Sequence, residues 1–240
     1  MGFFDKKYCD VCEEKIGLLG NRKLSDGNMC KSCASLLSPF ATDRRKTSLS
    51  EIKEHLAYRD ENISQVEAFN VTRSLGAKTK VLLDEDARKF IVTSFSNWQS
   101  ENPDVVDFSQ VTGCQTEIRE IRTELKVRDK DGQEMSFSPP RYDYDYDFYI
   151  TIHVNSPWFN EMGFKINDRR VNQRGSVEYR EMERQANEIK TALTQVRQEV
   201  RENVLAASAP KVAQTCPGCG ATTTPDASGC CEFCGGAMQG

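Results

Sequence analysis

The stretch Glu124-Leu-Lys-Val-Arg-Asp-Lys-Asp-Gly-Gln-Glu-Met-Ser-Phe137 decides the fold class of this chain. Two short runs, 124–127 and 134–137, lie on either side of the turn sequence Asp129-Lys-Asp-Gly132. An Asp-Gly pair between two such runs is a strong signal for a β-hairpin. The stretch therefore predicts two antiparallel strands.

Further strands are expected on both sides of this hairpin. The runs 80–83 and 89–93 flank a polar turn, and 105–118, 142–154 and 164–166 also follow a strand pattern. The total is about six or seven antiparallel strands within residues 68–168. In 142–154 aromatic residues alternate with aspartates, which predicts a half-buried strand whose aspartates face solvent.

One long helix is predicted after the strands, over residues 176–204. Its apolar residues recur every three or four positions: Met182, Ala186, Ile189, Leu193, Val196, Val200 and Val204. This stripe can pack on the sheet, and its later turns can pair with a partner helix, which includes self-association. Strands followed by one helix predict an α+β fold, either a pleckstrin-homology-like (PH-like) barrel closed by the helix or another antiparallel sheet.

The chain divides into five parts. They are a first cysteine module (8–38), a helical connector (39–67), the PH-like β domain with its helix (68–204), a linker (205–215) and a second cysteine module (216–236). In the connector, Ser48 and Glu51 have the spacing of a capping box at the start of a helix, with Ile52, Leu56, Ile63 and Val66 at near-helical spacing.

The first cysteine module holds two C-x-x-C pairs, Cys9 with Cys12 and Cys30 with Cys33. Zn²⁺ is bound by four thiolates in a tetrahedron, and two residues between cysteines let one turn direct both sulfurs at one ion. The sequence between the pairs is long enough for a hairpin, and Ala-Ser-Leu-Leu after Cys33 favours a helix. Turn, hairpin and helix together predict a treble-clef-like zinc site. Its apolar residues are expected to be Ile16, Leu18, Leu19, Leu24 and Leu36.

The second module has the pattern of a zinc ribbon. Cys216 and Cys219 form one pair and Cys231 and Cys234 the other, with glycine after the second cysteine of each pair. Cys230 can replace Cys231, but the two-residue spacing and the position of the glycines favour Cys231. The sequence therefore predicts two structural zinc ions, one in each module.

Other uses of the cysteines have less support. A redox C-x-x-C pair needs thioredoxin-like surroundings, and disulfides need a secretory context that the N-terminal sequence does not indicate. The spacings do not match the usual ferredoxin patterns. Cys114 has no partner in sequence and is interpreted as a small buried residue.

Two resemblances accompany these patterns. Residues Cys9, Cys12, Lys15-Ile16-Gly17, Lys23-Leu24, Asp26-Gly27, Cys30 and Cys33 resemble an uncharacterised bacterial family with an N-terminal zinc-binding domain of unknown function. The last part of the chain resembles the generic zinc ribbon found at the tails of many bacterial proteins. The resemblance implies zinc and a cytoplasmic bacterial setting, and it implies no activity.

Composition and motifs narrow the function classes. The formal charge is -4, and Zn²⁺ with four thiolates adds about -2 at each site, which disfavours strong nucleic-acid binding. No apolar run of transmembrane length and no catalytic motif such as a P-loop is present, so we expect a cytoplasmic protein that is not an enzyme. The predicted function is an adaptor or scaffold for an unidentified protein partner. The alternatives are lipid-headgroup binding by the PH-like domain and nucleic-acid binding by the zinc modules.

Overall fold

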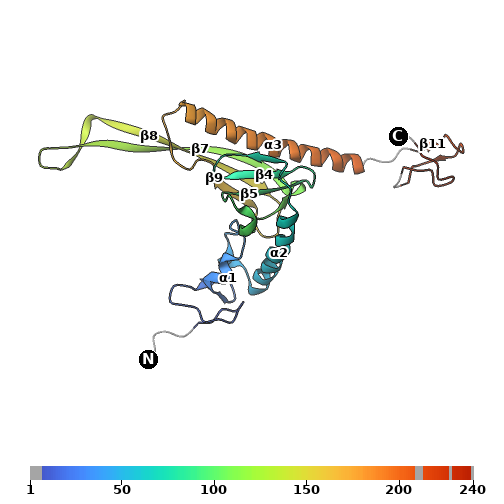
Figure 1. Ribbon diagram of the computed structural model, residues 1–240, viewed down its shortest axis with the longest axis horizontal. Helices are drawn as coiled ribbons and strands as arrows, with labels where there is room; N and C mark the ends of the chain where they lie inside the picture. Colours follow the sequence, from blue (N-terminus) through green and yellow to red (C-terminus); the bar gives the residue numbers. More distant parts are fainter. Residues whose placement is uncertain (1–6, 209–212, 227–228, 239–240) are drawn as a thin grey trace. The chain divides into compact units, whose positions relative to one another are not determined.

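The computed structural model describes residues 7–208, 213–226 and 229–238, and it divides into two compact units, Met1–Arg197 and Gln198–Gly240. The first unit contains two four-stranded sheets and the helices α2 (Leu49–Ala68) and most of α3 (Val177–Ser208) (Figure 1). Helices and sheets are both present, so the α+β prediction is confirmed at this level.

The shorter elements complete the description. They are β1 (Arg22–Lys23), β2 (Asn28–Met29), α1 (Lys31–Ser35), η1 (Arg44–Lys46), η2 (Trp98–Glu101), η3 (Phe108–Gln110), β11 (Gln214–Thr215) and β12 (Thr222–Thr223). No helix among the described residues is both long enough and apolar enough to cross a membrane.

The first sheet is antiparallel and has the strand order β3 (Arg73–Leu75), β4 (Lys80–Asp84), β5 (Lys89–Thr93) and β6 (Val106–Asp107). On one face, Leu82 and Ile91 pack with Val66 at the end of α2. The residues of opposite parity, such as Val81 and Phe90, are buried as well. Because both faces are covered, β4 and β5 are continuous apolar runs rather than alternating ones.

The second sheet is built around a long hairpin of β7 (Val111–Arg128) and β8 (Glu134–Val154), as the Asp-Gly turn predicts. Gly132 in that turn has a φ of 81°, a left-handed conformation that glycine adopts without strain. The strands β9 (Glu161–Lys165) and β10 (Val171–Asn172) pair with the other edge of β8.

The prediction of a PH-like barrel is not confirmed. The described strands of residues 68–204 form two separate four-stranded sheets, and neither closes on itself through hydrogen bonds. The two sheets touch near Thr79, whose hydroxyl donates to the carbonyl oxygen of Lys165 at 2.9 Å.

The prediction that all the aspartates of strand 142–154 face solvent is wrong for Asp147. This residue is buried, and its carboxylate accepts hydrogen bonds from Lys165 and Asn167, both at 3.2 Å. Near its end the strand lies between β7 and β9, so its second face is covered too, and the carboxylate is satisfied by neighbouring polar groups.

Helix α3 packs its N-terminal half on the second sheet. Tyr179 makes edge-on ring contacts with Tyr146 and Phe148 of β8, with ring centroids 5.1 Å apart in each case. The predicted stripe residues Ala186, Ile189, Leu193 and Val196 are buried. Val204 is exposed, so the pairing of the later turns with a partner helix stays a prediction. The helix ends at Ser208, within the stretch predicted as a linker, of which residues 209–212 lie outside the described part of the chain.

Helix α2 begins with the predicted capping box. The Ser48 hydroxyl accepts from the backbone N–H of Glu51, and the Glu51 carboxylate accepts from the backbone N–H of Ser48. Ile63 was expected on the apolar face of the helix but is exposed. The buried face instead carries three polar residues, His55, Arg59 and Asn62.

These polar residues hold two chain segments against α2. Arg59 forms an ion pair with Asp104 at 2.8 Å, and the exposed fractions of the two side chains are 8% and 0%. Arg59 also donates to the carbonyl oxygen of Leu36 at 3.1 Å. Asn62 donates to Pro103 and accepts from the backbone N–H of Val105. The end of the first cysteine module and the loop before β6 are therefore tied to one helix.

Candidate metal centres

Three of the four cysteine pairs lie in turns of the same geometry, and each turn starts at the first cysteine of its pair. In each turn the first cysteine accepts a backbone hydrogen bond from the fourth residue after it and donates one to the fifth. The first cysteines are Cys9, Cys216 and Cys231, with backbone distances between 2.8 and 2.9 Å. The fourth residues, Glu13, Gly220 and Gly235, all have positive φ, between 61° and 72°. The two glycines after the ribbon pairs thus occupy a conformation that favours glycine.

In the first centre, the other cysteine pair lies at the start of a helix. Cys30 is the N-cap of α1, and its sulfur accepts from the backbone N–H of Cys33 at 3.3 Å. The backbone N–H of Cys30 in turn points at the Cys9 sulfur, 3.2 Å away. The hairpin of β1 and β2 connects the turn to this helix, as the sequence predicts.

The four Sγ atoms of Cys9, Cys12, Cys30 and Cys33 lie within 4.8 Å of one another. The Cys9 and Cys33 sulfurs are 3.8 Å apart, and so are those of Cys12 and Cys30. These separations exclude disulfide bonds, whose sulfurs are about 2 Å apart.

The second centre lies in the C-terminal unit and combines two of the turns. The Sγ atoms of Cys216, Cys219, Cys231 and Cys234 also lie within 4.8 Å of one another. The Cys216 and Cys234 sulfurs are 3.6 Å apart, and those of Cys219 and Cys231 are 3.7 Å apart. Cys231 belongs to this cluster and Cys230 does not. Residues 227–228 of this module lie outside the described part of the chain.

Both clusters have the dimensions of a tetrahedral zinc site. A Zn–S distance of about 2.3 Å in a regular tetrahedron places the sulfurs about 3.8 Å apart. The four sulfur–sulfur separations given above lie between 3.6 and 3.8 Å. All four ligand positions would come from cysteine, so such a site leaves no position for water or substrate.

Backbone N–H groups favour the thiolate form of one cysteine in each cluster. Burial of Cys9 raises its pKa, but N–H groups of Cys12, Cys30 and Val11 outweigh this effect and lower the pKa to about 6. In the second centre the N–H groups of Cys219 and Gly218 lower the pKa of Cys216 to about 7. Stabilised thiolates are what metal ligation requires.

The apolar residues that are buried around the first centre differ in part from those predicted. Ile16 and Leu24 are buried as expected, together with Met29, Leu37 and Ile52 of α2. The prediction is wrong for Leu18, Leu19 and Leu36, which are exposed. The module uses the start of α2 as part of its core, so residues of its own loops remain at the surface.

Comparison with known proteins shows that the first centre lies in a segment that matches a known family model. Residues 7–55 match the family model described as Domain of unknown function (DUF4428). The match covers all four cysteines of the first centre and the beginning of α2. No curated protein and no solved structure shows detectable similarity to the chain.

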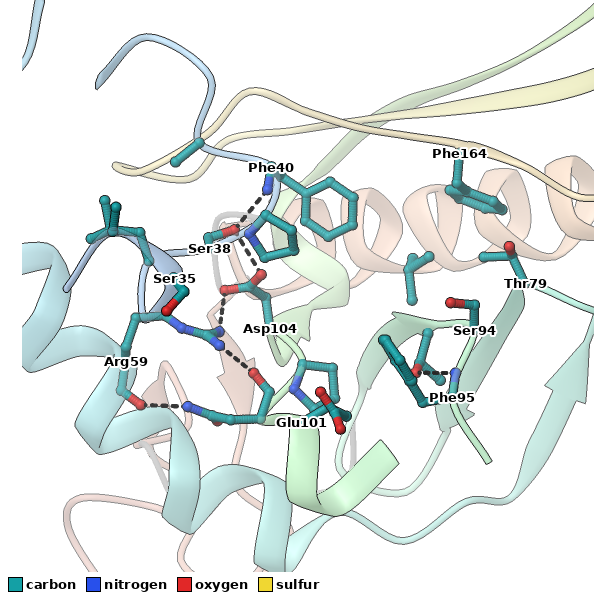
Figure 2. A pocket seen from close by; sticks show the side chains of 18 of the residues that line it. Ser35, Ser38, Phe40, Arg59, Thr79, Ser94, Phe95, Glu101, Asp104 and Phe164 are labelled. Atoms are coloured by element: carbon teal, nitrogen blue, oxygen red, sulfur yellow. Dashed lines mark hydrogen bonds and ion pairs between the residues drawn. The ribbon is translucent and has the colours of Figure 1, made fainter. Parts of the chain in front are cut away.

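A pocket of about 580 Å³ lies beside the buried ion pair of the first unit. Figure 2 shows Ser38 and Arg59 on one side of Asp104 and the rings of Phe40, Phe95 and Phe164 on the other. Ser38 donates to Asp104 at 2.7 Å. Sequence reasoning did not identify this pocket, because six separate chain segments contribute to it and none carries a motif.

Proposed function

We propose that this chain is a cytoplasmic, non-enzymatic adaptor or scaffold that mediates protein–protein interaction and is held in shape by two structural zinc ions. The observation that carries the proposal is the pair of four-cysteine clusters, one in each compact unit. Four cysteine ligands close the coordination sphere, which suits a structural ion and not a catalytic one. In this proposal the first centre is treble-clef-like and the second is a zinc ribbon.

Exposed apolar side chains on both modules support protein contact. Leu18 and Leu19, adjacent in sequence, are 85% and 88% exposed in the first module. Phe233, between the last two cysteine ligands, is 68% exposed. Small zinc modules have too few residues to bury all their apolar side chains, but a fixed metal-bound turn presents such a residue in one orientation.

The nucleic-acid alternative has less support. Residues 213–238 contain no lysine or arginine, while Asp226 and Glu232 add negative charge. Phosphate backbones are bound mainly through lysine and arginine. The lipid alternative depends on a PH-like barrel, and the described strands of residues 68–204 form two open sheets instead.

In this proposal Asp104, which lines the pocket, has a structural role. Its buried carboxylate is paired with Arg59 and accepts from the Ser38 hydroxyl. Burial raises the pKa of Asp104, and the charge of Arg59 opposes that shift. The ion pair ties α2 to the loop before β6.

Capture of partners by surface variants tests the proposal. Tagged full-length wild type would be compared with Leu18→Ser/Leu19→Ser, with Phe233→Ser and with Val177→Ser. Val177 is an exposed valine outside both modules and serves as the matched control. We expect a defined set of proteins whose recovery falls at least about fivefold in one or both module variants and is unchanged in the control.

Three checks complete this experiment. All variants must keep the zinc content of the wild type, so that loss of a partner reports the surface and not the fold. Equal recovery from all variants would contradict the adaptor proposal. Submicromolar affinity for DNA or RNA at physiological salt would favour the nucleic-acid alternative instead.

A further inference from the structure

The outer edge of β7 has no described strand beside it. This strand has 18 residues and pairs with β8 on one side, and no other described strand pairs with it. In the part of β8 that pairs with β7 from Arg122 onward, no other described strand pairs with β8, because β10 pairs only with Asp145 and Tyr146. Residues 122–144, here called the arm, are therefore a two-stranded ribbon, which Figure 1 shows extending past the strands of the other sheet.

A two-stranded ribbon of this kind is marginally stable in water. Its apolar side chains Leu125, Val127 and Met135 are exposed. Addition of strands to the ribbon would cover part of this surface and satisfy the backbone groups of the open edge.

The two edges of the arm differ in how open they are. On β8, Pro139 and Pro140 interrupt the edge. They lie in a bulge of β8, because Leu125 of β7 is opposite Arg141 whereas the next residue, Lys126, is opposite Ser136. Proline and irregular pairing protect an edge from other strands, because proline has no N–H to donate. β7 contains no proline, so every residue of this strand keeps a backbone N–H that can donate to a neighbouring strand.

The sequence of this open edge is complementary to itself. In residues 120–126, Glu-Ile-Arg-Thr-Glu-Leu-Lys, antiparallel pairing of two copies about Thr123 places Arg122 opposite Glu124. The same pairing places Ile121 opposite Leu125 and Glu120 opposite Lys126. Two-fold symmetry makes each of these pairs occur twice. Opposite charges and apolar residues that face each other directly stabilise neighbouring strands.

The adjacent registers are unfavourable. The symmetry pairs only residues that point to the same face, so the register can change only in steps of two residues. One such step pairs Arg122 with itself and Glu120 with Glu124. The opposite step pairs Glu124 with itself and Arg122 with Lys126. Both steps bring like charges together, so the charge pattern selects the register centred on Thr123.

The contacts within one chain are compatible with this pairing. The Arg122 guanidinium lies 3.4 Å from the ring centroid of Tyr142, and Lys126 is 3.8 Å from the Glu134 carboxylate. Both contacts are with β8, on the faces of the ribbon, so they leave the backbone edge of β7 open. They also hold the two basic side chains on the face where Glu124 and Glu120 of a second copy would lie.

We propose that two copies of this chain associate through the β7 edges of their arms, forming a four-stranded sheet in the order β8, β7, β7, β8 with Thr123 at the two-fold axis. The occupant of the open edge is a second copy because the edge is complementary to itself in charge and in apolar residues. None of the metal ligands takes part in this pairing, which does not depend on the adaptor proposal.

Charge exchange tests the register. Full-length, zinc-loaded wild type would be examined by sedimentation equilibrium from about 1 to 100 µM, together with Arg122→Glu, the exchange Arg122→Glu/Glu124→Arg, and Lys130→Glu. Lys130 lies in the turn of the hairpin and controls for the change in net charge. We expect a wild-type dimer, a dimer at least about 10-fold weaker in Arg122→Glu, recovery in the double exchange, and no effect of Lys130→Glu.

A cross-link tests the same register without depending on the charges. Opposed residues in an antiparallel pair have Cα atoms about 4.5–5.5 Å apart, within the range that a disulfide spans. Thr123→Cys should therefore give a covalent dimer under mild oxidation, and Ser136→Cys on β8 should not.

Several results would overturn the proposal. A wild type that is monomeric over the whole concentration range would leave the edge to a strand of another protein. A dimer insensitive to Arg122→Glu would place the contact elsewhere, for example on the end of α3. A weakened dimer that the double exchange does not restore, or a lack of Thr123→Cys cross-linking, would contradict the register.

Discussion

Replacement of Cys12 by serine is expected to unfold residues 9–33 locally and to leave the two sheets of the first unit folded. The segment contributes Ile16, Leu24 and Met29 to a small apolar cluster. Burial of each contributes only about 1.5–3 kcal/mol, whereas ordering the backbone costs about 1–2 kcal/mol for every residue. Zinc binding, worth about 10–16 kcal/mol in small zinc-finger peptides, is the contribution large enough to offset that cost.

Amide hydrogen exchange measured by mass spectrometry checks this expectation. Protection in 9–33 should fall to that of an unstructured chain in Cys12→Ser, while β4, β5 and β8 keep theirs. Cys114→Ser is the matched control, because Cys114 lies on β7 outside both clusters. A chelator should act as Cys12→Ser does and should also expose residues 216–234. Protection of 9–33 after its zinc has left would mean that apolar packing against α2 holds this module.

Loss of the buried ion pair is expected to have the second largest effect. Arg59→Ala leaves the Asp104 carboxylate fully buried without its cation, and removal of one partner from such a pair costs about 3–5 kcal/mol. It also removes the bond to Leu36 that ties the first cysteine module to α2. Chemical denaturation of the first unit should detect this loss, and Lys53→Ala, on the exposed side of the same helix, should change stability by less than about 0.5 kcal/mol.

An apolar double variant separates charge burial from simple loss of packing. Arg59→Met/Asp104→Leu removes both charges and keeps most of the volume, so it should be more stable than Arg59→Ala. If Arg59→Ala loses less than about 1 kcal/mol, or if the double variant is the less stable of the two, the pair does not hold the unit together in the way described.

The parts of the fold that local chemistry determines could be predicted from the sequence. The Asp-Gly turn located the β7–β8 hairpin, and Ser48 with Glu51 located the start of α2. The spacing of the cysteines located both clusters and favoured Cys231 over Cys230. Each of these features depends on residues close together in the sequence.

Features that depend on distant segments could not be predicted. The polar residues His55 and Arg59 lie on the buried face of α2 because the loop before β6 and the end of the first module supply their partners. Burial lowers the pKa of His55 to about 4, so the ring stays neutral and accepts the Ser38 N–H. The spacing of apolar residues in the sequence instead predicted that Ile63 lies on that face. The exposure of Leu18 has a similar cause, because α2 supplies the apolar surface that the module lacks.

The number of zinc ions bound per chain tests most directly whether the protein has two zinc centres. Full-length protein purified without added metal or chelator would be measured by inductively coupled plasma mass spectrometry, with protein concentration from amino-acid analysis. Two clusters of four cysteines predict about two zinc ions per wild-type chain and about one in Cys12→Ser. A value near zero or one in the intact wild type, or iron in place of zinc, would contradict the assignment of these clusters as structural zinc centres.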